Sequence, residues 1–210
     1  YTTLFRSQAG DVKYKDLTGE GEVTPGASTL ENHGDLKRIG NNSPRYRVGL
    51  NLDAAWKGID FSIFFQGVLK RDWMFDAGDP YFWGAGSGMW QAACFEEHMD
   101  YWTPENTDAY YPKPYFNETK NQQAQDAYMQ KASYLRCKNI QLGYTLPTHI
   151  TEKAGISNCR IYLSCDNLFT ITGLSSVYDP EAFGSYDGYG TSGKTYPLQR
   201  TISVGVNLNF

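Results

Sequence analysis

Oxygen-bearing side chains alternate along one short acidic stretch of the sequence, DLTGEGEV. Asp16, Thr18 and Glu20 have the spacing of the first three ligands of a calcium-binding loop. Gly21 follows where such a loop turns, but Ala27 stands at the position of the expected bidentate acid. Because Ca²⁺ and Mg²⁺ prefer oxygen ligands, two interpretations stay open: an acidic turn without metal, or a partial Ca²⁺ or Mg²⁺ site at Asp16–Gly21. No other cofactor is expected.

A second acidic pair lies in the motif YDPE, where Asp179 and Glu181 are separated by one proline. Two carboxylates can cleave a glycosidic bond when they flank it. No further catalytic partner is visible near this pair, which favours a motif that fixes a loop. The glycine-rich stretch GAGSG, residues 84–88, follows no convincing strand and opens no helix, so flexibility is favoured over phosphate binding. We therefore do not expect an enzyme.

Aromatic residues are concentrated between residues 73 and 116. So many in one segment indicate burial against something: one another, a partner protein or the rings of a sugar. Aromatic faces with nearby Asp and Asn suit neutral glycans. Trp83, Trp90 and Trp102 are the predicted ligand or partner contacts, because large rigid rings provide contact area at little entropic cost.

The bulk properties exclude several classes of protein. Of the 210 residues 40% are hydrophobic, mean hydropathy is −0.53, and no apolar run is long enough for a transmembrane helix. Strands of a membrane barrel stay possible, because only every second residue must be apolar. The net charge of −4 does not support nucleic-acid binding. The four cysteines match no metal-binding spacing, and we expect mostly free thiols. Nothing at Tyr1 has the character of a leader peptide, so we expect a processed chain or a fragment.

Apolar and polar residues alternate with a period of two in several segments, which predicts strands. These segments are 45–56, 61–67, 139–147, 160–169 and 201–210. The connections between them alternate in length. Short ones are expected at about 57–60 and 147–158, and long ones at about 10–44, 70–131 and 173–197. Outer-membrane barrels have short periplasmic turns and long extracellular loops in this way.

These features predict an all-β fold, an antiparallel transmembrane β-barrel that contacts the lipid bilayer through its apolar face. Aromatic residues near strand ends, such as Tyr46, Trp56 and Phe210, would form the interfacial girdles. The smallest bacterial barrels need about eight strands, so the chain is expected to supply the last five or so of a larger barrel. A soluble carbohydrate-binding β-sandwich and a passive porin or structural barrel are the alternatives.

Seven blocks of the sequence occur in an order that resembles one known family. They are GDVKYKDLTGEGEVT, SPRYRVGLNLDAAWKGIDFSIFFQG, YWTPENTDAYYP, ASYLRCKNIQLGYTLP, RIYLSCDNLFTITG, YDPE and YPLQRTISVGVNLNF. Together they resemble the C-terminal part of the SusC/RagA family of TonB-linked outer-membrane transporters of Bacteroidetes. The resemblance covers nearly the whole of residues 1–210.

The resemblance implies a multi-pass protein of the bacterial outer membrane, with a plugged barrel of about 22 strands. It implies an active importer of a large nutrient, an oligosaccharide being favoured over an oligopeptide. The implied partners are the remaining barrel and plug, a SusD-like surface lipoprotein that acts as a lid, and the TonB complex. It further implies that Phe210 serves as an assembly signal; the alternative is that Phe210 is only a girdle residue. The plug domain is not among these 210 residues.

Overall fold

The chain forms two compact units in the computed structural model, which describes residues 7–87, 93–116, 118–182 and 196–210. Tyr1–Asn41, Met74–Met129 and Gly184–Lys194 make up the first, here called the loop unit. Asn42–Trp73, Gln130–Phe183 and Thr195–Phe210 make up the second, the sheet unit. The loop unit contains most of the residues that the sequence predicted as long loops; the prediction that residues 1–210 are the C-terminal portion of one barrel domain stays a prediction.

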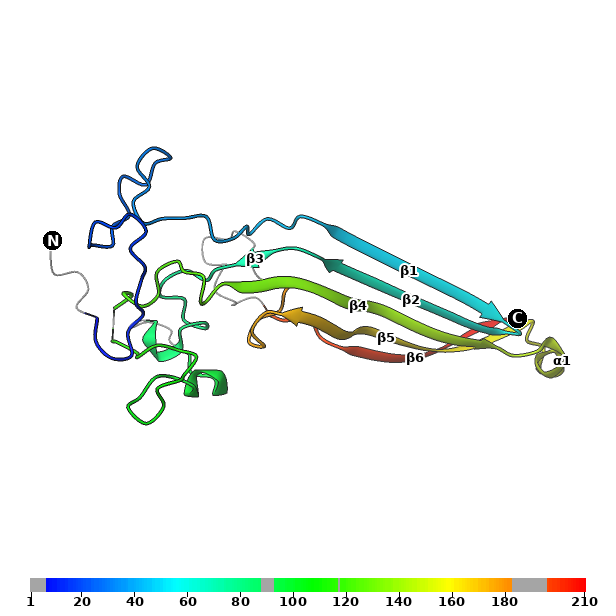
Figure 1. Ribbon diagram of the computed structural model, residues 1–210. Helices are drawn as coiled ribbons and strands as arrows, with labels where there is room; N and C mark the ends of the chain where they lie inside the picture. The colour runs from blue at the N-terminus through cyan, green and yellow to red at the C-terminus, as the bar shows by residue number, and fades with distance from the viewer. Residues whose placement is uncertain (1–6, 88–92, 117, 183–195) are drawn as a thin grey trace. The chain divides into compact units, whose positions relative to one another are not determined.

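The sheet unit is built on one antiparallel sheet (Figure 1). Its strands are β1 (Arg47–Trp56), β2 (Ile59–Val68), β4 (Gln130–Thr145), β5 (Asn158–Gly173) and β6 (Thr201–Asn209), hydrogen-bonded in that order. The two-residue strand β3 (Asp72–Trp73) pairs with the beginning of β4. The predicted antiparallel all-β fold is confirmed. Strands β4 and β5 are 16 residues each and extend well beyond the segments in which the sequence alternates.

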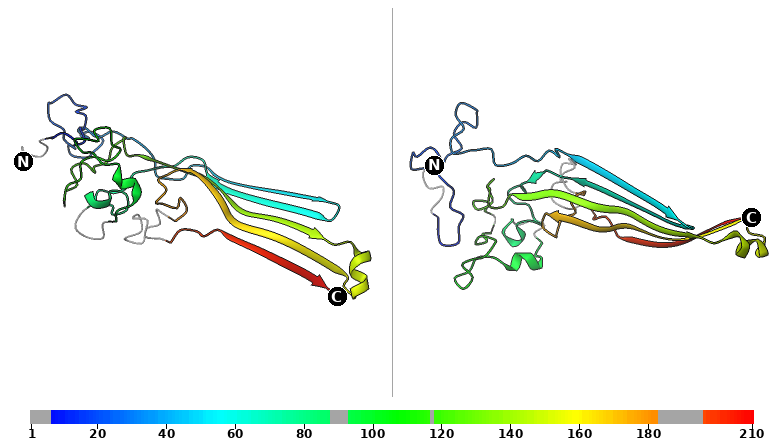
Figure 2. Two further views of the ribbon diagram at one scale, coloured as in Figure 1. Left: turned by 90° about the horizontal axis from the view of Figure 1, so that it is seen from below. Right: turned by 45° about the vertical axis from the view of Figure 1, so that its right-hand side comes forward.

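Short connections lie together at one end of this sheet (Figure 2). Lys57 and Gly58 join β1 to β2 with φ values of 48° and 85°, as a two-residue hairpin turn with two positive φ angles requires. Strands β4 and β5 are joined through α1 (Thr148–Thr151) and η3 (Glu152–Ala154), which end at Gly155 with a φ of 71°. The segments 69–129 and 174–200 leave from the opposite end of the strands.

The two faces of the sheet differ in polarity. Residues that are paired across antiparallel strands project from the same face, so the register assigns each side chain to a face. The apolar face comprises Leu50, Leu52, Ala54, Trp56, Ile59, Phe61, Ile63, Phe65, Ile140, Leu142, Tyr144, Ile161, Leu163, Cys165, Ile202, Val204, Val206 and Leu208. Much of it is exposed: Trp56 is 67% exposed, Leu142 51% and Val204 74%.

The opposite, polar face carries charged, amide, hydroxyl and glycine residues. Its members include Asn51, Asp53, Asp60, Ser62, Gln66, Asn139, Gln141, Gly143, Arg160, Tyr162, Ser164, Asp166, Ser203, Gly205 and Asn207. Phe64 interrupts this polarity, and its ring lies near Gly49 of the neighbouring strand. The alternation predicted from the sequence therefore holds in β1, β2, β5 and β6, with Phe64 as an exception, and in residues 139–145 of β4.

A β-bulge at Lys138 changes which residues of β4 belong to each face. Between Asn139 and Cys137 the strand β4 advances two residues, while β2 advances only one. The bulge inverts the alternation, so Arg136 shares the polar face with Thr170 of β5, and Cys137 is paired with Phe169. Without the bulge Arg136 would project from the apolar face.

The loop unit has an aromatic core. Phe75 and Phe82 are each 1% exposed, and their rings stack with centroids 4.7 Å apart. Trp83, Tyr111 and Tyr128 pack around them. Two short 3-10 helices, η1 (Gly84–Gly86) and η2 (Glu96–Met99), belong to this unit. None of the helices in the described ranges is both long and apolar enough to cross a membrane.

The N-terminal segment is bound to the same core by long-range polar contacts. Asp11 forms an ion pair with Lys120 at 3.0 Å, and the backbone N–H of Val12 donates to the Oδ1 of Asn121. The hydroxyl of Tyr14 donates to the carbonyl of Lys120 at 2.8 Å. These contacts join residues more than 100 positions apart. They connect the two predicted loops, at about 10–44 and 70–131, within the loop unit.

Candidate functional site

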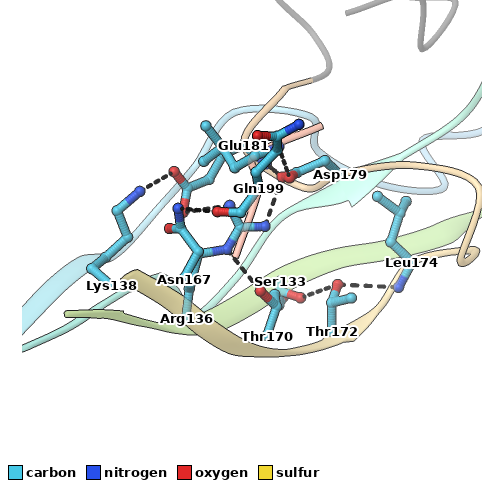
Figure 3. A network of polar contacts seen from close by, with 11 residues as sticks. Ser133, Arg136, Lys138, Asn167, Thr170, Thr172, Leu174, Asp179, Glu181 and Gln199 are labelled. Carbon is cyan, nitrogen blue, oxygen red and sulfur yellow. Dashed lines mark hydrogen bonds and ion pairs between the residues drawn. The ribbon is translucent and has the colours of Figure 1, made fainter. Parts of the chain in front are cut away.

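The densest group of buried charges lies on the polar face of the sheet unit, around Arg136 (Figure 3). Its Nε donates to the Oγ1 of Thr170 at 2.7 Å, across the β4–β5 pair. Its Nη2 donates to the Oδ1 of Asp179 at 2.8 Å, and its Nη1 lies 3.4 Å from the Oε1 of Glu181. The Nζ of Lys138, at the bulge, donates to the other oxygen of Glu181 at 3.0 Å.

This network holds both ends of the connection between β5 and β6. Asp179 accepts the backbone N–H of Glu181 at 2.9 Å and that of Leu198 at 3.0 Å. Burial by itself would raise the pKa of Asp179, but these N–H groups and the Arg136 guanidinium stabilise the ionised form, and the pKa is lowered. The YDPE carboxylates are therefore engaged in ion pairs that fix a loop onto β4, as the sequence favoured.

A cavity of about 430 Å³ lies beside the network at the loop end of the polar face. Arg47 of β1, Gln66 of β2 and Tyr134 of β4 line it from the sheet. Arg71, from the segment after β2, and Pro180 and Glu181 of the YDPE turn complete its wall. The cavity has two guanidinium groups and one carboxylate among these side chains.

The predicted aromatic contacts fall in different environments of the loop unit. Trp83 is 5% exposed, its Nε1 donates to the carbonyl of Asp76 at 3.1 Å, and its ring packs edge-on against Tyr128. Its indole thus offers little area to a ligand in this structure. Trp102 is partly exposed and covers the backbone of Gly10, where a Cβ would lie 2.5 Å from the indole. Trp90 lies outside the described residues.

The acidic stretch at Asp16 forms a turn in which backbone N–H groups of the same stretch donate hydrogen bonds to the Asp16 carboxylate. Asp16 accepts hydrogen bonds from the N–H groups of Gly19 and Gly21, and Thr18 donates its hydroxyl to the same carboxylate. Asp35 accepts three further backbone N–H groups, from Leu17, Thr18 and Thr24. Within the part of the chain that the structure describes, no group of three or more His, Cys, Asp or Glu side chains is arranged to hold a metal.

Metal binding by Asp16, Thr18 and Glu20 stays a prediction, and the contacts seen are those of an acidic turn. The role of Phe210 in assembly stays a prediction as well; the residue directly follows β6 and is 87% exposed. All four cysteines are free thiols.

Sequence reasoning missed Arg136, Lys138 and Thr170 as functional residues. Arg136 lies three residues before the alternating segment 139–147, and this position was the signal that could have placed it in the same strand. A buried arginine in a strand needs a carboxylate partner. Its partner Asp179 is 43 positions away, and no local pattern connects the two.

The fold is an antiparallel sheet with one apolar and one polar face, and comparisons with known proteins show which class of protein contains such a sheet. No protein-family model matches the chain. TonB-dependent receptor P3 of Formosa agariphila is 30% identical over 97% of the chain, and TonB-dependent receptor P26 of the same organism is 26% identical over 96%. The chain spans about a fifth of the length of these relatives, 19% and 20%.

Solved structures show the same likeness in three dimensions. The RagAB peptide importer in its open-open state matches 80% of the chain with a TM-score of 0.54 and 26% identity, and the match covers 17% of that chain. The RagAB peptide transporter matches with a TM-score of 0.53. The resemblance inferred from the seven sequence blocks is confirmed: the chain is similar over nearly its whole length to TonB-dependent receptors, and its fold matches part of a RagAB structure.

Proposed function

We propose that the chain forms part of the barrel wall of a TonB-dependent importer in the bacterial outer membrane, which takes up a large nutrient together with a SusD-like surface lipoprotein. The observation that carries this proposal is the apolar face. It carries exposed apolar side chains on several strands, among them Leu50 (52%) of β1, Leu142 (51%) of β4, Leu163 (48%) of β5 and Val204 (74%) of β6. A hydrocarbon environment accounts for such a face, because lipid replaces the missing protein core.

The polar face then faces the lumen, and the segments 69–129 and 174–200 face the cell exterior. The free thiol of Cys94, exposed in the first of these segments, provides a direct test. In the intact receptor on whole cells, a membrane-impermeant maleimide should label Cys94 and should not label a Cys94→Ser variant. A cysteine placed at the exposed Lys153 of η3, in the Cys94→Ser background, should stay unlabelled until the outer membrane is permeabilised. Labelling of Lys153→Cys but not Cys94 on whole cells would refute the orientation.

The lipoprotein partner is proposed to contact exposed apolar side chains of the loop unit. Phe116 is 76% exposed and Met99 is 66% exposed, so both are available without unfolding the aromatic core. Alanine at both positions should reduce the amount of lipoprotein that co-purifies with the receptor. Leu142→Ala, on the apolar face of the sheet unit, is the control and should leave the amount unchanged. Unchanged co-purification in the double variant would refute this contact.

Cargo class is a separate part of the proposal. The aromatic loop residues favoured an oligosaccharide, whereas the RagAB system is a peptide importer. We propose a large oligomeric nutrient of one of these two kinds. Uptake of labelled oligosaccharides and oligopeptides by cells with and without the receptor gene distinguishes them. Equal uptake of both by the two strains would contradict the importer function.

A further inference from the structure

The cavity on the polar face lies at a point where three strands and one turn meet. Arg47 is paired with Val68, and Val68 with Tyr134, so these residues place β1, β2 and β4 side by side at its floor. The turn with Pro180 and Glu181 forms a wall. The Arg136 network fixes that wall, because Asp179 and Glu181 are both bound by cationic side chains of β4.

Arg71 is held in the cavity by specific contacts. Its Nε donates to the carbonyl of Asn42 at 2.9 Å, and its guanidinium lies 4.8 Å from the centre of the Trp73 ring. Burial lowers the pKa of Arg71, and repulsion from the nearby Arg47 acts in the same direction. Both guanidinium groups line the same cavity.

Asp179 and Glu181 of the YDPE turn are each paired with a basic side chain, whereas Arg47 is paired with no acid in the described residues. Within residues 7–87, 93–116, 118–182 and 196–210, no carboxylate forms an ion pair with Arg47. Glu181, the acid in the cavity wall, is bound by Lys138 at 3.0 Å and lies 3.4 Å from Arg136. Arg47 thus brings a positive charge without an acid partner in the described residues to the cavity lining, and the Tyr134 phenol and Gln66 amide add neutral hydrogen-bonding groups.

We propose that this cavity binds a carboxylate group of the imported nutrient, with Arg47 and Arg71 as its charged donors. The guanidinium fork matches the planar geometry of a carboxylate and forms charge-assisted hydrogen bonds with it. This inference rests on the proposed import function and adds a cargo-recognition site to it.

A carboxylate of this kind has two sources, an oligopeptide and a uronic-acid oligosaccharide. The test uses the intact receptor, purified in detergent with its lipoprotein, and two matched pools of probes. The first pool holds oligopeptides with free or amidated C-termini and no acidic side chains. The second holds oligogalacturonates, intact or reduced at the carboxyl to the neutral sugar. Retained probes are identified by mass spectrometry, and their affinities are measured by titration.

Wild-type receptor should retain the carboxylate-bearing member of one pool in preference to its neutral counterpart. Arg47→Gln should weaken its binding by about tenfold, the order expected for loss of a hydrogen bond to a charged group, and leave the neutral counterpart unchanged. Arg45→Gln removes the same charge two positions away, outside the cavity lining, and should have little effect. Which pool is retained identifies the source of the carboxylate.

Other outcomes overturn the proposal in distinguishable ways. Equal retention of carboxylate and neutral probes by the wild type, or equal losses in the Arg47→Gln and Arg45→Gln variants, would refute the cavity as a carboxylate site while import stands. Retention of nothing from either pool would count against the import function as well. A wild-type preference that Arg47→Gln does not change would place recognition elsewhere in the receptor.

Discussion

Arg160 of β5 reaches across the intervening strand β4 to Asp60 of β2, with its Nε 2.9 Å from the Oδ1 of Asp60. The ion pair passes over Gly143, which is paired with Asp60 on one side and with Tyr162 on the other. A Cβ at Gly143 would lie 2.5 Å from the Asp60 Oδ1 and 2.6 Å from the Arg160 Nη2. The glycine therefore provides the space through which three strands are joined on the polar face.

Gly143→Ala is expected to displace this ion pair and destabilise the barrel wall by about 1–3 kcal/mol, the usual cost of overpacking. The measurement is the temperature at which the intact receptor loses its compact, heat-modifiable band on electrophoresis. Gly49→Ala is the matched control, because a Cβ there would meet the Phe64 ring at an ordinary 3.5 Å. Equal unfolding temperatures for the two variants would show that the space above Gly143 is unimportant.

Asp179→Asn should release the connection between β5 and β6 from the sheet. Removing one partner of a buried ion pair costs roughly 3 kcal/mol, and here the side chains of Arg136 and Asp179 are only 5% and 6% exposed. Hydrogen exchange of residues 175–182 and 196–199 in the intact receptor should rise about a hundredfold, by the conversion of about 1.4 kcal/mol per factor of ten.

The control for this variant is Asp126→Asn, which removes the acid of the exposed Lys37–Asp126 pair. Exposed pairs contribute about 0–1 kcal/mol, so exchange should stay near the wild-type rate. Unchanged exchange in Asp179→Asn would mean that the Arg136 network does not hold the connection.

The sequence predicted those strands in which apolar and polar side chains alternate, because the two faces of the sheet have different surroundings. A sheet with one apolar and one polar face requires a period of two, and the sequence shows that period in β1, β2, β6, most of β5 and residues 139–145 of β4. Residues 130–138 of β4 were missed because the bulge at Lys138 inverts the alternation there. Arg136 and Lys138 lie in this missed part of β4, as does Tyr134 of the cavity lining.

For the loops, the amino-acid composition predicted that aromatic side chains are buried, but it did not predict which of them are. The density of aromatic rings indicated burial, yet nothing in the sequence separated the buried Trp83 from the partly exposed Trp102, because the loops have no period. The acidic stretch at Asp16 matched a metal-binding spacing, whereas its hydrogen bonds depend on the fold of the whole turn and on Asp35.

Trp83→Ala is expected to open the loop unit, since truncating a buried tryptophan costs about 3–5 kcal/mol. Brief digestion of the intact receptor with a protease should cleave between residues 74 and 129 much faster in this variant. Phe116→Ala, which removes a 76% exposed ring of the same unit, should be digested like the wild type. A digestion-resistant Trp83→Ala variant with impaired cargo binding would instead support direct ligand contact by Trp83.

The turn around Asp35 should lose stability in acid over a defined range. Three backbone N–H groups, first that of Thr24, lower the pKa of Asp35 from 3.8 to about 2. Because the folded-state pKa lies below the unfolded one, the stabilisation is complete above about pH 4 and is lost as the pH falls toward 2. Hydrogen bonds from Gly21 and Gly19 also lower the pKa of Asp16, so both carboxylates act in the same direction. Pepsin digestion of the intact receptor should therefore cleave residues 14–36 much faster at pH 2 than at pH 4, after correction with a denatured substrate. In Asp35→Asn, which cannot titrate, digestion should already be fast at pH 4 and change less between the two values. A wild-type turn that is equally resistant at both values would show that the ionised carboxylates do not stabilise it.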